Sequence, residues 1–265
     1  MRTRLSVMSS DKSEPVNPYD VFEGIVSVRS VFSGIDKGVC DRKILEILFC
    51  EESIKGNGRL LGFLKARSFV YGYQLRTVPK AVIESYADGS SHGGLIMLCG
   101  KRIFKNRLAN PKDNGFYIYL EGIEDPFNLG FAIRSAYAAG ADAILLSPHN
   151  PLSSAGIVCR SSAGASELSE IVICSDSEAL KELKRLSYKF VCSDKDAPVS
   201  AFDADLSKPI CLAIGGEKRG LSSLCTVLAD FSVSLPYGSD FPMALSAASS
   251  AAVLSFEVLR QNRGN

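Results

Sequence analysis

The sequence lacks the features that would place it among membrane, secreted or strongly basic proteins. Its 265 residues contain no run of eighteen apolar residues, and the N-terminus has no apolar core of a signal peptide. Thirty Lys and Arg against 29 Asp and Glu leave a net charge of +1, so no global positive field collects polyanions. With 46% hydrophobic and 22% charged residues, we expect a cytoplasmic globular protein of one large or two modest domains.

Motifs for metal, redox and common nucleotide chemistry are also missing. There are two histidines, and the eight cysteines are scattered singly with no C-x-x-C pair, so no metal site is expected. Several cysteines lie in apolar runs, which indicates buried thiols in a reducing compartment. Neither the G-x-G-x-x-G fingerprint nor a P-loop is present, so a nucleoside-type ligand would need a different cradle.

The apolar patterns predict two α/β domains. Residues 1–18 are polar and aperiodic and are expected to be a flexible tail. Residues 19–99 predict a small domain, in which the three- and four-residue apolar spacing of 19–34 indicates a helix. Residues 100–114 are expected to be a basic linker, whose cations up to residue 112 are Lys101, Arg102, Lys105, Arg107 and Lys112.

Strand and helix patterns alternate strongly from residue 115 to residue 265. This alternation predicts a mostly parallel sheet with helices on both faces, closed by a long helix near 244–261. Ligands of such sheets bind beyond the C-terminal ends of the strands. The chemistry is therefore expected at the strand ends of this second domain.

Two segments at predicted strand ends carry candidate site residues. After the first strand, Asp125-Pro126 makes a turn, Asn128 is placed to cap the next helix, and Arg134 stands among small apolar neighbours. Further on, Gly215-Gly216 ends another strand and lets a ligand lie against bare peptide. Taken singly, an ordinary surface arginine and a tight turn explain these features as well.

Glu217 and the third segment complete the pattern. Glu217 follows the paired glycines, where it also suits a helix N-terminus through the helix dipole. In residues 233–261, a strand ends at Leu235-Pro236 and a helix rich in Ala and Ser follows Leu245. Such small residues permit close approach of a ligand, another chain or a crossing segment, and they also suit a plainly packed helix.

Together with RSSAGA at 160–165, these segments resemble the SPOUT methyltransferases, and within them the TrmH (SpoU) group of RNA ribose 2'-O-methyltransferases. The resemblance covers residues 116–261. It implies a parallel α/β domain with a deep trefoil knot, a rare exception to the rule that chains do not thread, and a homodimer. The N-terminal half resembles the family's ribosomal-protein-like substrate-binding domain, ending in SSHGGLIM at 90–97 with Gly93 in place of the usual Gln.

The resemblance implies S-adenosylmethionine (SAM) as cofactor, contacted by Gly215, Leu235 and Leu245. It gives Arg134 the central catalytic position. A guanidinium keeps its proton beyond about pH 12, so we expect Arg134 to hold a phosphate and orient the 2'-hydroxyl, with its role as a base left open. Transfer from a sulfonium neutralises the leaving group, so no metal is required.

The remaining implied roles belong to Asn128, Glu217 and Ser246. Asn128 is expected to shape the site, and Glu217 to pair with or orient Arg134. The family's third motif usually reads Ser-Leu-Asn-Val-Ser, whereas this chain reads Ala-Leu-Ser-Ala-Ala at 244–248. The hydroxyl of Ser246 thus replaces an amide and offers one donor instead of two.

RNA is the expected partner, ribosomal RNA more than transfer RNA, bound through local basic patches. One patch is the linker; the other is residues 65–80, where cations alternate with Phe69, Tyr71 and Tyr73. A buried aromatic helix face explains the second string without RNA. Two alternative functions stay open: a non-catalytic RNA-binding relative, and an unrelated α/β enzyme that binds another nucleotide.

Overall fold

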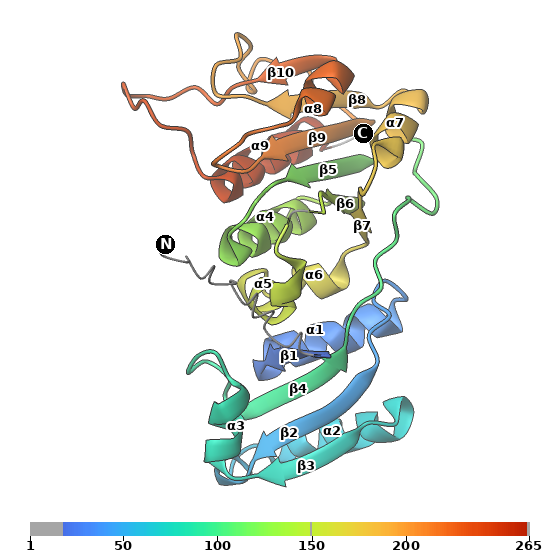
Figure 1. Ribbon diagram of the computed structural model, residues 1–265, viewed down its shortest axis with the longest axis vertical. Coiled ribbons are helices and arrows are strands. Elements are labelled where there is room, and N and C mark those ends of the chain that lie inside the picture. The colour runs from blue at the N-terminus through green and yellow to red at the C-terminus, as the bar shows by residue number, and fades with distance from the viewer. Residues whose placement is uncertain (1–17, 149, 264–265) are drawn as a thin grey trace, which may run out of the picture.

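The computed structural model describes residues 18–148 and 150–263, which form two β-sheets stacked along the long axis of the molecule (Figure 1). The predicted flexible tail lies outside the described residues except for Pro18. Within the described ranges, no helix has the length and apolar content needed to cross a lipid bilayer.

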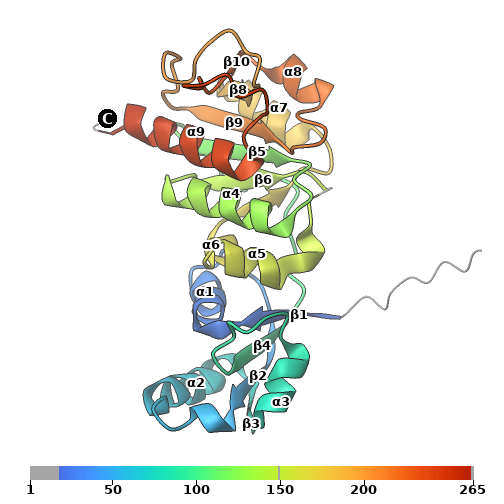
Figure 2. The same ribbon diagram turned by 90° about the vertical axis from the view of Figure 1, so that its left-hand side faces the viewer.

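The N-terminal sheet has four strands in the order β1-β4-β2-β3, with β2 and β3 parallel and the other pairs antiparallel. The strands are β1 (Tyr19–Glu23), β2 (Ile44–Cys50), β3 (Gln74–Val78) and β4 (Leu95–Gly100). Helices α1 (Gly24–Asp36) and α2 (Gly58–Tyr71) pack on one face, and α3 (Lys80–Tyr86) packs on the other (Figure 2). A single 3-10 turn, η1 (Glu51–Ser53), precedes α2.

The helix expected over residues 19–34 is wrong in its first part. Tyr19–Glu23 forms strand β1, paired antiparallel with β4, and α1 begins only at Gly24. The apolar spacing misleads because Val21 and Phe22 face opposite sides of the sheet, where Phe22 joins the core under α1. The apolar alternation of a strand is also broken because Asp20, on the buried face of β1, is a polar residue that pairs with Arg42.

The C-terminal sheet has six strands, all parallel, in the order β10-β8-β9-β5-β6-β7. This agrees with the parallel α/β sheet predicted from the alternating patterns. The strands are β5 (Phe116–Glu121), β6 (Ala143–Leu146), β7 (Ile171–Ile173), β8 (Lys189–Ser193), β9 (Ile210–Gly215) and β10 (Phe231–Val233).

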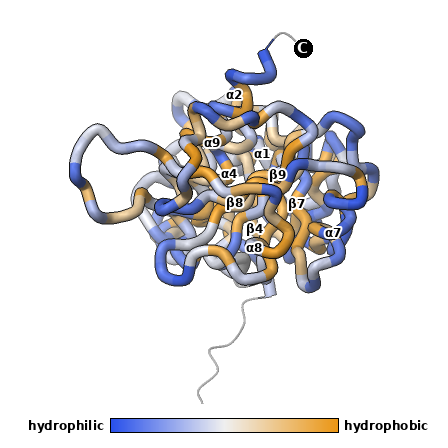
Figure 3. The backbone as a smooth tube through the Cα atoms, turned by 90° about the horizontal axis from the view of Figure 1, so that it is seen from above, coloured by the Kyte–Doolittle hydropathy of each residue, from blue (hydrophilic) through white to orange (hydrophobic). Residues whose placement is uncertain are grey.

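Helices cover both faces of this sheet (Figure 2). Side chains alternate along β5, so Ile118 and Leu120 pack under α4 and α9 whereas Tyr117 and Tyr119 pack under α7 and α8. Apolar segments accordingly concentrate in the central strands (Figure 3). The helical elements are α4 (Pro126–Ala138), η2 (Leu152–Ser154), α5 (Ala155–Ser161), α6 (Ala165–Leu168), α7 (Glu178–Arg185), α8 (Ser223–Leu228) and α9 (Ala247–Gln261).

A buried cluster of charges joins the two sheets. Arg42 donates from Nη1 to Asp20 Oδ2 at 2.6 Å and from Nε to Glu167 Oε2 at 2.8 Å. Asp20 lies on β1 and Glu167 on α6, and all three side chains are almost fully buried. Burial lowers the pKa of Arg42, but the two carboxylates outweigh it and leave that pKa above its usual value. One guanidinium thus links the two halves of the chain.

Two of the linker cations, Lys101 and Arg102, take part in the same joint. Arg102 donates to the carbonyl oxygens of Ser166 and Ser169 at 2.7 and 2.9 Å. The other four cations reach carboxylates, in the pairs Lys101–Asp20, Lys105–Glu170, Arg107–Asp176 and Lys112–Asp142. The linker was expected to offer a basic patch to RNA. Lys101 and Arg102 thus help to fix the two sheets together, whereas Lys105, Arg107 and Lys112 stay exposed in surface pairs, and the RNA patch of the linker stays a prediction.

The joint predicts a large effect of removing its central cation. Arg42→Met should lower the free energy of unfolding by about 3–5 kcal/mol, because two buried carboxylates lose their partner. Urea unfolding followed by circular dichroism measures the change. Lys181→Gln, which breaks an exposed pair with Glu178 on α7, serves as the control and should leave the midpoint unchanged. Equal effects of the two substitutions would contradict the structural role of Arg42.

Candidate active site

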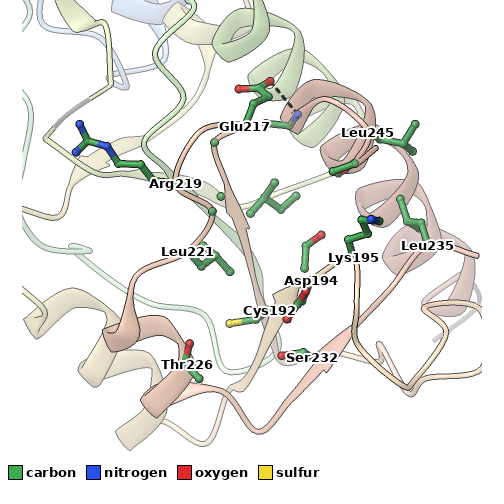
Figure 4. A pocket seen from close by; sticks show the side chains of 18 of the residues that line it. Cys192, Asp194, Lys195, Glu217, Arg219, Leu221, Thr226, Ser232, Leu235 and Leu245 are labelled. Atoms are coloured by element: carbon green, nitrogen blue, oxygen red, sulfur yellow. Dashed lines mark hydrogen bonds between the residues drawn. The ribbon is translucent and has the colours of Figure 1, made fainter. Parts of the chain in front are cut away.

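A pocket of about 390 Å³ opens at the C-terminal ends of β8, β9 and β10 (Figure 4). Three of the predicted cofactor contacts, Gly215, Leu235 and Leu245, line it, and so does Glu217. Its size lies within the usual range of small-molecule sites, about 300–1,000 Å³. The pocket thus lies at strand ends of the parallel sheet, where the strand-end rule expects ligands.

Crossing backbones form one wall of the pocket. A Cβ on Gly215 would lie 2.3 Å from the Gly220 carbonyl carbon, and one on Gly216 would lie 2.0 Å from the Gly122 oxygen. Gly220 N donates to Gly216 O at 3.0 Å, and Gly216 N donates to Glu121 O at 2.7 Å. Both glycines are thus required because neighbouring backbone leaves no room for a side chain. Gly215 also exposes its peptide groups to the pocket.

The carboxylate of Glu217 connects all three predicted segments. Its Oε1 accepts hydrogen bonds from Asn128 Nδ2 at 3.0 Å and from the backbone N–H of Ala247 at 3.1 Å. Asn128 lies in the first turn of α4, and Ala247 is the first residue of α9. The bond to Ala247 is drawn in Figure 4. One oxygen atom therefore holds the start of two helices to the loop after β9.

Helix caps explain two of the predicted site residues differently. The expected cap, Asn128, is wrong: Asp125 caps α4, and its Oδ1 accepts the N–H of Asn128 at 2.7 Å. Asn128 is thereby free to use its amide on Glu217. Ser246 caps α9, because its Oγ accepts the N–H of Ser249 at 3.1 Å. Neither Asn128 nor Ser246 lines the pocket of Figure 4.

Arg134 lies outside the pocket, on the exposed face of α4. The expected pair with Glu217 is not formed in this chain, since among residues 18–148 and 150–263 no hydrogen bond or ion pair of the Arg134 side chain is found. Phe131 and Phe127, one and two turns earlier on α4, are each 45% exposed. The guanidinium is therefore an unpaired cation at the end of an apolar stripe.

Several pocket residues were not predicted from the sequence. Asp194 and Lys195 follow β8, Thr226 lies on α8, Ser232 lies on β10, and Tyr237 follows it. In Figure 4, Leu235, Leu245 and Lys195 lie on one side of the pocket and Leu221 and Thr226 on the other. The strand ending at Ser193 was recognisable, so the strand-end rule also applied to Asp194 and Lys195.

The cysteines are buried thiols, as the apolar runs predicted, and Cys192 forms part of the pocket wall. Burial raises the pKa of Cys192 to about 12, with further contributions from Glu121 and Asp194. Burial and Glu121 likewise raise the pKa of Cys225 to about 12. A thiol with such a pKa stays protonated at neutral pH, so these groups act as apolar packing and do not supply nucleophiles.

The second predicted RNA patch is largely used inside the chain. Arg67 pairs with Asp36 at 2.8 Å, and Tyr73 is buried with its hydroxyl donating to Leu64 O at 2.6 Å. Arg76 and Lys80 pair with Glu46 and Glu84 at 3.0 and 3.1 Å. The alternative reading, an aromatic face packed on the core, therefore accounts for most of residues 65–80.

Comparison with known proteins identifies the family. A model described as the SpoU rRNA Methylase family matches residues 115–256. The chain belongs to the SpoU rRNA methylase family. It is 26% identical over 244 residues to the 23S rRNA (guanosine-2'-O-)-methyltransferase RlmB of Xylella fastidiosa (strain 9a5c), with 89% of this chain and 96% of that protein covered.

Solved structures agree with membership of the SpoU family. The crystal structure of an RNA 2'-O ribose methyltransferase superposes with a TM-score of 0.72 at 26% identity, covering 92% of this chain and 89% of the other. The AdoMet-bound rRNA methyltransferase from Sinorhizobium meliloti has the same fold, with a TM-score of 0.76 at 22% identity and coverage of 92% and 88%. The family predicted from the three segments is thus confirmed.

The bonds of Glu217 generate a prediction for this SpoU site. Glu217→Ala should cost about 1 kcal/mol of unfolding free energy and speed hydrogen exchange at the Ala247 amide, which loses its acceptor. Glu217→Gln keeps an acceptor oxygen and should preserve slow exchange. Hydrogen exchange measured by NMR distinguishes the two variants. Equally fast exchange at Ala247 in wild type and Glu217→Ala would show that the carboxylate does not hold α9.

Proposed function

We propose that this SpoU family member transfers a methyl group from SAM to the 2'-hydroxyl of a ribosomal RNA nucleotide. The observation that carries the proposal is the pocket at the ends of β8, β9 and β10, built from the segments that define the family and joined through Glu217. The relatives named as 23S rRNA methyltransferases support ribosomal RNA over transfer RNA as substrate.

The residues of the pocket fit SAM. Leu235 and Leu245 supply apolar walls for an adenine ring, and the peptide groups beside Gly215 supply donors and acceptors for its edge. Asp194 and Ser232 add polar groups for a ribose or an ammonium group. When bound, SAM supplies a methyl group on a positively charged sulfur, which becomes a neutral thioether on transfer.

The chain's own contribution is positioning. Its residues would hold the 2'-hydroxyl facing the methyl group that SAM would supply, and the hydroxyl proton would leave to solvent or to a nearby base. Arg134 is proposed to bind the adjacent phosphate and orient the hydroxyl, because a guanidinium offers a planar fork of donors. The hydrogen bond between Asn128 and Glu217 holds the loop after β9 against the start of α4. Ser246 contributes by capping α9.

Assembly into a homodimer is part of the proposal. The exposed face of α4 presents Phe127 and Phe131, and the neighbouring α9 presents Val253 and Phe256 at 38% and 47% exposure. Apolar faces of this kind are typical of interfaces between subunits. Arg134 lies on the same helix as Phe127 and Phe131, and it is proposed to complete the pocket of the partner instead of its own.

The trefoil knot and the roles of the flanking regions are proposed from the family. In support of the knot, Lys195 Nζ donates to Pro242 O and Ala247 N donates to Glu217, so residues 242–247 contact the loops after both β8 and β9. The N-terminal sheet, residues 19–99, is proposed to bind RNA. A cytoplasmic location is supported by the eight unpaired, buried cysteines.

The function is tested by SAM calorimetry and by transfer of labelled methyl groups into ribosomal RNA. Arg134→Ala should reduce methyl transfer at least about 100-fold while SAM affinity stays within a few-fold of wild type. Arg134→Lys keeps the charge but loses the fork, so its activity should be intermediate. Absence of SAM binding in the wild type would overturn the proposal, and near-normal turnover of Arg134→Ala would overturn the role of Arg134.

The homodimer is tested by light scattering at micromolar concentration. Wild type should have the mass of two chains. The double variant that carries both Phe131→Glu and Phe256→Glu should have the mass of one chain and should lose methyl transfer. Phe202→Glu, at a phenylalanine that is 50% exposed outside α4 and α9, is the matched control and should stay dimeric. A monomeric wild type that methylates RNA would contradict a site shared between two copies.

A further inference from the structure

One cation of the predicted patch at residues 65–80 has no partner in the part of the chain that the structure describes. Arg67, Arg76 and Lys80 are paired with carboxylates, whereas no ion pair or side-chain hydrogen bond of Lys65 is found. Lys65 lies on α2, together with Phe69.

The outer face of α2 combines positive charge with exposed apolar surface. Phe69 is 90% exposed and Val70 is 69% exposed. Among large apolar residues on the described helices, only Val227 of α8, at 80%, is also this exposed. Arg59, like Lys65, is exposed and has no side-chain partner within residues 18–148 and 150–263. Helix α2 contains no acidic residue. A partner for this face is therefore expected to be anionic and to offer flat apolar groups.

Helical spacing places these residues on one surface. Arg59, Gly62, Ala66 and Phe69 recur at three- and four-residue intervals, while Leu64 on the opposite side is fully buried against the sheet. The span from Arg59 to Phe69 is about 15 Å at about 1.5 Å per residue. A Cβ on Gly62 would meet no atom within 4 Å, so the middle of the face is open.

Contacts within the folded chain exclude two other residues of α2, Arg67 and Tyr71, from this face. Arg67 lies over the rings of Phe32 and Phe63 and pairs with Asp36, which removes it from the outer surface. Tyr71 donates its hydroxyl to the same carboxylate. The stacking role predicted for three aromatic residues is thus left to Phe69 alone.

We infer that the outer face of α2, formed by Arg59, Lys65, Phe69 and Val70, binds a single-stranded segment of the RNA substrate. Phe69 stacks on a nucleobase, and Arg59 and Lys65 contact phosphates. The inference rests on the proposed function. The face lies at the end of the molecule opposite to the pocket (Figure 1). Within one protein chain, it therefore binds a part of the RNA that is remote from the nucleotide to be methylated.

The test measures methyl transfer into full-length 23S ribosomal RNA as a function of RNA concentration. Phe69→Ala and Lys65→Gln should each raise KM several-fold, and the variant carrying Phe69→Ala, Lys65→Gln and Arg59→Gln should raise it at least about tenfold, given stacking worth about 1–3 kcal/mol per base. The value of kcat and the affinity for SAM should not change. RNA affinity of the triple variant should also depend less steeply on salt, because two phosphate contacts are lost.

Controls keep the outcomes distinct. Phe202→Ala and Lys208→Gln remove an exposed aromatic residue and a lysine from the C-terminal half and should leave KM unchanged. Unchanged KM and salt dependence in the triple variant would overturn the inference while leaving the proposed function intact. Loss of the dimer in Phe69→Ala by light scattering would assign the face to a second copy and would also overturn it. If wild type transfers no methyl group to RNA, the proposed function itself fails.

Discussion

The arrangement of the site depends on two hydrogen bonds accepted by one carboxylate oxygen. Glu217 receives the amide of Asn128 and the backbone N–H of Ala247, and these donors come from helices separated by more than a hundred residues of chain. The loop that contains Glu217 crosses a second loop so closely that Gly216 has no room for a side chain. Polar bonds and tight backbone crossing together fix the wall against which a cofactor is proposed to lie.

Much of this site was accessible from the sequence, because its signals are local. Paired glycines at a strand end, a turn at Asp125-Pro126 and a small-residue helix are short patterns, and the expected parallel sheet gathers strand ends at one edge. The family followed from their combination. Gly215, Leu235 and Leu245 line one pocket, and their contact with a cofactor stays a prediction.

The errors concern partners that only the folded chain brings together. Asn128 was expected to cap α4, yet Asp125 performs that role and leaves the Asn128 amide to Glu217. The RNA patch expected at the basic linker stays a prediction, but its ion pairs could not be predicted, because the carboxylate partners lie far away in the sequence, at positions such as Asp20 and Asp176. Composition counts charges but does not show which of them are already neutralised. Strand β1 was missed because its buried position 20 carries Asp, the ion-pair partner of Arg42, which breaks the apolar alternation that marks a strand.

The buried joint around Arg42 has a mechanical consequence. Turning the N-terminal sheet relative to the larger one would separate Arg42 from Glu167 in a region that solvent does not reach. Water would not compensate for the loss of that buried contact, so the ion pairs of Arg42 favour one orientation of the two sheets over others.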